Sequence, residues 1–183
     1  MKALFREVSY RLSKLLAEVE DGEIGLPEIQ RPFVWSRPKV RDLFDSMYRG
    51  FPVGYLLFWE NPSIRSTRQI GTDQKQHIPR RLIVDGQQRL TSLYSVMRGM
   101  PVVDDQYHET NLLIAFRPRD GRFAVPDATT ERDPEYIRNI SELWSGDLSR
   151  HRFQTGFIER LNVSRSLSPN EEDHIVEAID RLY

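Results

Sequence analysis

The sequence predicts an α+β fold, with a mixed domain over residues 1–128 and a helical extension over residues 129–183. Apolar residues recur at helical spacing in several segments, and short apolar runs typical of strands lie between those segments. From about Asp133 onward the pattern becomes helical. A chain of 183 residues with 39% hydrophobic content can bury one core with a small appendage.

The N-terminal part is expected to contain two helices and a strand. Residues 9–20 carry apolar side chains at the spacing of an amphipathic helix. A second helix is expected after Ser36, which suits an N-cap, and Gly50 ends it. The run 51–59 is apolar on both faces, which predicts a central strand, whereas the polar residues 60–80 predict an exposed connection.

The middle of the chain predicts a strand, a helix and a hairpin. Residues 82–84 form a short apolar strand, and the helix after Asp85 is closed by Gly99. The runs 111–116 and 122–125 flank a turn sequence and predict a β-hairpin.

The clearest helix signal is the last one. Ser168, Pro169 and Glu171 form a capping box with proline at the first helical position. The apolar pattern that follows runs to Tyr183 without a stop signal, so we expect the natural protein to continue beyond it.

Composition excludes several classes of protein. The chain has no cysteine, which excludes disulfides and thiolate metal sites and favours the cytoplasm. No apolar run approaches the ~20 residues of a membrane span, and no signal peptide is expected at the start. The four histidines show no metal-ligand spacing.

The net charge of −1 conceals an uneven distribution. Residues 31–89 carry eleven basic and five acidic side chains, whereas residues 90–183 carry eleven basic and sixteen acidic ones. The basic excess fits a polyanionic partner such as a nucleotide or nucleic acid, or simply a solvated basic face.

The segment from Asp85 to Arg89 has the pattern of an anion site. A strand that turns into a helix start presents free N–H groups, and Gly86 allows the backbone to approach a ligand. Gln87 and Gln88 add amide donors, and Arg89 adds a planar fork suited to phosphate. Asp85 would repel phosphate unless it holds Mg²⁺ or a water. The alternative is that Asp85 caps the helix and the glutamines are solvated.

A second polar cluster, Gln30-Arg31-Pro32, lies upstream. Pro32 keeps Arg31 out of helical geometry, so the arginine projects from an extended segment. With Phe33 and Trp35 beside it, Arg31 could stack on a base or hold phosphate; alternatively, the two aromatic residues attach the loop to the core.

The blocks "LPEIQRPFVWSRPKVRDLFDSMYRGFPVGYLLFW" and "LIVDGQQRLTSL" resemble the N-terminal domain of GmrSD-type, modification-dependent restriction endonucleases. The resemblance covers residues ~8–100. It implies a ParB/sulfiredoxin-like nucleotide-binding domain with a C-terminal helical extension. Residues 85–89 match the family's DGQQR box, residues 30–32 match its QRP block, and Pro52 and Gly54 match its P-x-G.

The resemblance implies a nucleotide-binding, NTP-hydrolysing regulatory domain of a phage-defence protein. The candidate catalytic residues are Asp85, Gln88 and Arg89, and the nucleotide base is unspecified. Asp85 is the candidate Mg²⁺ ligand because a carboxylate beside phosphate donors is usually bridged to the phosphate by a metal. The residues expected to hold the nucleoside triphosphate are Gln30, Arg31, Pro32, Gly86, Gln87, Gln88 and Arg89. The expected partners are DNA through the full-length protein and a C-terminal nuclease domain or partner subunit. A homo-oligomer is compatible with the sequence.

Two alternatives remain open. In the first, the domain binds or senses DNA without catalysis, through Arg37, Lys39 and Arg41 in the basic segment. In the second alternative, residues 31–89 themselves form a ParB-like nuclease centre. That alternative is weak because a metal nuclease needs a cluster of carboxylates. The acidic residues of the segment do not have the spacing of such a cluster; they are Asp42, Asp45, Asp73 and Asp85.

Overall fold

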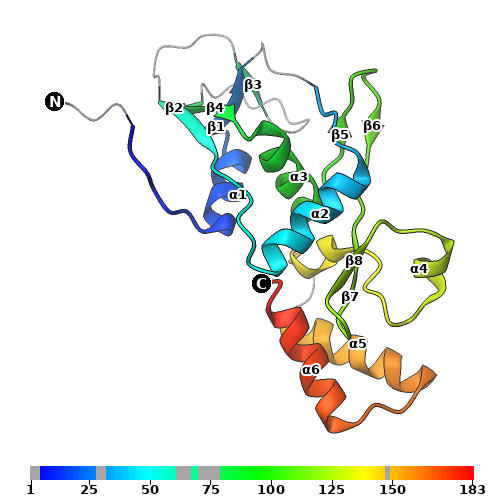
Figure 1. Cartoon of the computed structure of the whole chain (residues 1–183). Coiled ribbons are helices and arrows are strands. Elements are labelled where there is room, and N and C mark those ends of the chain that lie inside the picture. The colour runs from blue at the N-terminus through cyan, green and yellow to red at the C-terminus, as the bar shows by residue number, and fades with distance from the viewer. Residues whose placement is uncertain (1–4, 28–31, 61–66, 70–78, 147–148) are drawn as a thin grey trace. The chain divides into compact units, whose positions relative to one another are not determined.

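The computed structural model describes residues 5–27, 32–60, 67–69, 79–146 and 149–183. Its helices and short strands confirm the α+β class (Figure 1), whereas the ParB/sulfiredoxin-like topology stays a prediction. The elements are α1 (Leu12–Glu20), β1 (Ile24–Pro27), α2 (Arg37–Tyr48), β2 (Leu57–Glu60), β3 (Thr67–Gln69), β4 (Arg81–Asp85), α3 (Gln87–Arg98), β5 (Val102–Val103), β6 (Glu109–Thr110), β7 (Ala115–Arg117), β8 (Arg122–Ala124), α4 (Ala128–Arg132), the 3₁₀ helix η1 (Ile140–Leu143), α5 (Arg150–Ser164) and α6 (Pro169–Asp180). Among these residues, no helix is both long and apolar enough to cross a membrane.

The chain divides into two compact units, and each is described by itself. The first consists of Met1–Gln30 and Leu56–Gln87, and the second of Arg31–Tyr55 and Gln88–Tyr183. The chain therefore passes from the first unit to the second within the first turn of α3. The sequence-based boundary at residue 128 stays a prediction.

The first unit is built around a four-stranded sheet in the order β2-β4-β1-β3. Strands β1 and β4 run parallel, whereas β3 and β2 pair antiparallel with β1 and β4 respectively. Helix α1 leads into β1, and its apolar face is buried as the periodicity predicts. The core side chains of this unit are Leu15, Leu16, Val19, Ile24, Leu82 and Ile83.

A partly buried polar contact fastens β4 to α1 in this unit. The Arg81 guanidinium lies 2.5 Å from the Glu18 carboxylate and donates a second hydrogen bond to the Tyr10 hydroxyl at 2.9 Å. Both charged side chains are mostly shielded from solvent, so removal of either one would leave a poorly solvated charge.

The predicted central strand over 51–59 is wrong in position and in length. Strand β2 begins at Leu57 and lies at one edge of the sheet. Two residues explain the late start. Pro52 lacks a backbone donor, and Gly54 has φ +86, which no regular strand contains. Because β2 is an edge strand, Leu57 and Trp59 keep about half of their surface exposed.

The core of the second unit contains an aromatic cluster between α2 and the β7–β8 hairpin. Phe116 is fully buried, and its ring centroid lies 4.7 Å from that of Phe123 and 5.2 Å from that of Tyr48. The tilted and edge-on arrangements suit the ring quadrupoles. This hairpin was predicted, and so was the buried face of α2, which includes Phe44.

The helical pattern expected from Asp133 onward is only partly correct. Ile137 is extended and exchanges two backbone hydrogen bonds with Phe116, at 2.8 and 2.9 Å. Tyr136, Ile137, Ile140 and Leu143 are buried where a bridge to the hairpin is followed by η1. The helix was predicted here because a short apolar run does not distinguish a strand from a helix.

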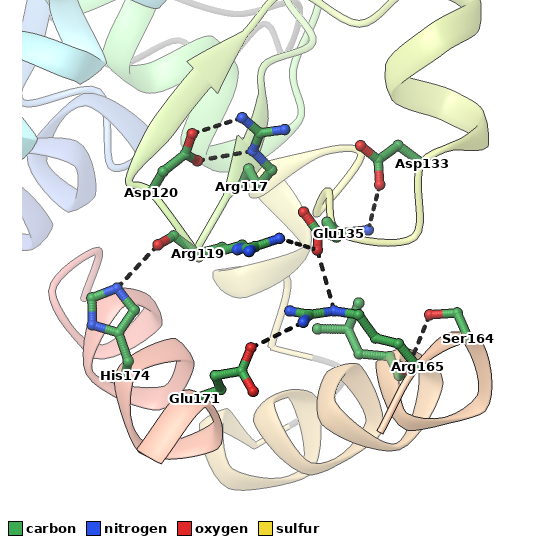
Figure 2. A network of polar contacts seen from close by, with 10 residues as sticks. Arg117, Arg119, Asp120, Asp133, Glu135, Ser164, Arg165, Glu171 and His174 are labelled. Atoms are coloured by element: carbon green, nitrogen blue, oxygen red, sulfur yellow. Dashed lines mark hydrogen bonds and ion pairs between the residues drawn. The ribbon is translucent and has the colours of Figure 1, made fainter. Parts of the chain in front are cut away.

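Ion pairs join the hairpin of the second unit to α5 and α6 (Figure 2). The Glu135 carboxylate lies 3.1 Å from Arg119 Nη1 and 3.3 Å from Arg165 Nε. Arg165 also pairs with Glu171 at 2.9 Å, and His174 Nε2 lies 3.1 Å from the Arg119 carbonyl oxygen. The predicted capping box at the start of α6 is present, and Glu171 thus serves both the cap and the network.

Candidate functional site

The predicted change from strand to helix at the DGQQR box is confirmed. Strand β4 ends at Asp85, and α3 begins at Gln87. Gly86 between them has φ +88, a left-handed conformation that a side chain would strain. Glycine is therefore required here by the turn itself, whatever the box binds.

The Gln88 side chain forms a two-point contact with a distant backbone segment of the second unit. Its Oε1 accepts a hydrogen bond from the Val34 N–H at 2.9 Å, and its Nε2 donates one to the Pro32 carbonyl at 3.0 Å. The amide thus bonds to both sides of Phe33, as a neighbouring strand would. We call this contact the Gln88 clamp.

Phe33, the residue between Pro32 and Val34, forms a backbone hydrogen bond of its own to a different segment. The Phe33 N–H donates to the Val103 carbonyl at 3.4 Å, and Phe33 is only 8% exposed. Trp35 is half-buried, and the Lys39 ammonium lies 4.5 Å from its ring centroid. The structural alternative for these two aromatic residues, attachment of the loop, is therefore supported for Phe33.

Arg89 makes the second contact from the start of α3. Its Nη1 donates to the Val53 carbonyl at 2.5 Å. Gly54 follows with φ +86, and a Cβ at this position would overlap the Arg89 guanidinium. The glycine of the P-x-G block therefore has two reasons to be glycine: its backbone conformation and the close approach of Arg89.

These contacts bring together three blocks that are far apart in the sequence. Gln88 contacts Pro32 of the QRP block and Val34 just after it, and Arg89 contacts Val53 of the P-x-G turn. Of the predicted site residues, Pro32, Gln88 and Arg89 belong to this arrangement in the second unit. Asp85, Gly86 and Gln87 are placed in the first unit, and Gln30 and Arg31 lie outside the described residues.

Sequence reasoning did not anticipate that backbone groups would be the partners of the two polar side chains. The carbonyl of Val53 and the amide of Val34 belong to apolar residues that carry no signal of their own. The glycine at position 54 is the available clue, since it marks a place where another group approaches the backbone.

Asp85 is exposed at the end of β4. Among the residues that the structure describes, no group of three or more histidine and acidic side chains could hold a metal ion by itself. Mg²⁺ commonly binds through one or two carboxylates together with the phosphates of a nucleotide, so a single carboxylate remains compatible with it.

The residues of the two alternative functions are engaged in local contacts. Lys39 lies over Trp35, and Arg41 pairs with Asp42 at 2.6 Å. Asp45 pairs with Arg49 at 2.8 Å. Lys39 and Arg41, two of the cations proposed to bind DNA, therefore have partners within the protein. Asp42 and Asp45, two of the acidic residues considered for a nuclease, are paired with arginines. Asp73 lies outside the described residues.

Comparison with known proteins gives two matches. A family model described as "GmrSD restriction endonuclease, N-terminal domain" matches residues 12–183. A curated relative, an uncharacterized protein of Methanocaldococcus jannaschii, is 36% identical over 92 residues. The match covers 45% of this chain and 16% of the relative, so the chain spans a small part of that protein.

Proposed function

Because this chain belongs to the GmrSD restriction endonuclease N-terminal domain family, we propose that it is a nucleotide-binding, NTP-hydrolysing regulatory domain of a restriction protein. The nucleotide base is unspecified. In this proposal the protein acts in the cytoplasm and controls a C-terminal nuclease domain or a partner subunit that cuts modified DNA.

One observation carries the proposal. The polar residues at the start of α3 organise two other motif blocks, through Gln88 to Pro32 and Val34 and through Arg89 to Val53. A helix start that follows a glycine turn points backbone N–H groups and the positive end of the helix dipole toward an anion. Motif side chains that fix the surrounding loops supply the preorganisation that phosphate binding requires.

We assign the phosphates to Arg89 and to the amide of Gln87. The Val53 carbonyl uses one of the five N–H donors of Arg89, and its contact orients the planar fork. Gly86, Gln30 and Arg31 complete the proposed nucleotide contacts. Gln88 was predicted to be catalytic; we propose that it acts by positioning the backbone from Pro32 to Val34, since both ends of its amide are bonded.

Asp85 is the proposed ligand of Mg²⁺. When bound there with a nucleotide, the ion would neutralise phosphate charge that otherwise repels the carboxylate. Asp85 would also be placed to orient an attacking water.

The test is a calorimetric titration of the chain with each nucleoside triphosphate and Mg²⁺, together with a phosphate-release assay. Arg89→Ala should weaken binding by about 10- to 100-fold, the equivalent of one charge-assisted hydrogen bond of about 1.5–3 kcal/mol. Arg132→Ala is the matched control, because Arg132 is exposed at the end of α4. Absence of binding at millimolar nucleotide would exclude the proposal.

A further inference from the structure

A groove in the second unit carries an excess of positive charge that the proposed nucleotide site does not use. It has a volume of about 320 Å³ and is lined by α5 and by residues of the segment 137–142, which includes part of η1. Its lining includes Arg138, Arg152 and Arg160, with Glu142 as the acidic residue among the described lining. We call it the α5 groove.

Three arginines line the groove, and Glu142 is the acidic side chain among its described lining. Arg160 is held by a hydrogen bond to the Tyr136 carbonyl at 3.4 Å and lies 4.9 Å from the ring centroid of Phe157. Partial desolvation, and then the charge of Arg138, lower the pKa of Arg160, whereas the charge of Glu142 raises it. In the part of the chain that the structure describes, no ion pair joins Arg138 or Arg152 to an acidic residue. An anion in the groove would relieve this repulsion.

Gly156 leaves room for a ligand beside the arginines of the groove. It lies in the middle of α5, where glycine weakens a helix, and a Cβ there would meet no described atom within 4 Å. Packing therefore does not require the glycine. It stands one helical turn from Arg152 and one from Arg160, so its missing side chain keeps the space between them open.

The shape of the site favours an extended ligand over a compact one. Pockets for small molecules enclose most of the ligand, whereas all three arginines here are exposed to solvent. Arg152 and Arg160 are separated by about 12 Å along the helix axis, which corresponds to about three to four nucleotides of a duplex strand. Half-buried Phe153 adds an apolar surface beside the charges.

We propose that the α5 groove binds the phosphate backbone of a nucleic-acid strand, through Arg138, Arg152 and Arg160. This surface uses none of residues 85–89, so it extends the proposed function without depending on nucleotide binding.

The test is fluorescence anisotropy of a short labelled DNA duplex with the full chain, between about 50 and 200 mM salt. The double substitution Arg138→Gln/Arg152→Gln should weaken binding by at least about tenfold and lower the salt slope by about two, one for each phosphate contact. The control Arg122→Gln/Arg132→Gln removes the same charge from exposed sites outside the groove. Equal effects of the two double variants, or no binding by the wild-type chain, would overturn the proposal.

A second pair of variants separates binding from folding. Gly156→Ala should stabilise α5 because nothing obstructs the new Cβ, whereas Gly156→Glu should retain the fold and abolish DNA binding. Full DNA binding by Gly156→Glu contradicts the proposal. Titrations with nucleotide should be unaffected by the groove variants, while Arg89→Ala should retain DNA binding. If a mononucleotide alone binds and depends on Arg138 and Arg152, the strand is excluded in favour of a small ligand.

Discussion

The Gln88 clamp makes the sharpest structural prediction. Substitution of Gln88 by leucine removes both hydrogen bonds to the loop around Phe33. Each such bond contributes about 0.5–1.5 kcal/mol, and these two are partly exposed, so the loss should be about 1–2 kcal/mol of local stability. The exchange rate of the Val34 amide proton should therefore rise by about tenfold.

Substitution by glutamate tests the geometry more closely. A carboxylate can still accept from Val34, but it places an oxygen where Nε2 now lies 3.0 Å from the Pro32 carbonyl. The protonated carboxyl recovers a donor and imitates the amide. Since hydrogen bonding favours the neutral form, the pKa of the new side chain should lie above its ordinary ~4.3. The defect should thus be present at neutral pH and diminish as the pH falls through that pKa.

The assay is amide exchange by NMR, with urea unfolding at neutral and acidic pH. Gln106→Glu, at an exposed turn between β5 and β6, makes the same chemical change outside the clamp. If Val34 exchanges at the wild-type rate in Gln88→Leu, or if Gln88→Glu shows no more pH dependence than Gln106→Glu, the two-point contact is refuted.

Three further predictions follow from the packing. Gly54→Ala should lower the free energy of unfolding by about 1–2 kcal/mol through backbone strain, and further because Arg89 is displaced. Gly50→Ala, at φ +76 with open space for its Cβ, should show the strain alone. Urea unfolding of the two variants measures both losses. Phe116→Ala should destabilise the second unit by about 3–5 kcal/mol, because this ring is fully buried; a loss under about 1 kcal/mol in the same assay would contradict that packing. Hydrogen bonds from Ser168 and the charge of Arg165 lower the pKa of Glu171 from 4.5 to about 2, so its contribution to stability should be complete above pH 4.5 and lost as the pH falls toward 2. An NMR titration of the wild-type carboxyl measures this pKa, and Glu171→Gln, which keeps the capping box, should remove the pH dependence of stability in urea unfolding.

Local patterns were sufficient for much of the secondary structure. The capping box of α6, with Ser168 and Glu171, depends on residues three positions apart, and the apolar face of α3 depends on one helical period. Such signals lie within a few residues, so one sequence contains them completely. The position of β2 was missed because a run that is apolar on both faces does not indicate whether the strand is central or at an edge. Pro52 and Gly54 were the residues that indicated a later start of the strand.

The candidate site was predictable in its residues but not in its contacts. Gln88 and Arg89 were identified from the strand-turn-helix pattern, which is local. Their partners at Val34 and Val53 are 54 and 36 positions away and are backbone groups, which every residue possesses. Apart from the glycine at position 54, no local pattern therefore marks the loops that these polar residues contact.

The most direct test of the central claim is an NMR titration of the ¹⁵N-labelled chain with Mg²⁺ and each nucleoside triphosphate. The proposed site predicts that the largest shifts fall on the amide signals of residues 85–89, with smaller shifts at Val34 and Gly54, and that Arg89→Ala suppresses them. Unchanged spectra at millimolar nucleotide, or shifts confined to other parts of the chain, would contradict a nucleotide site at the start of α3.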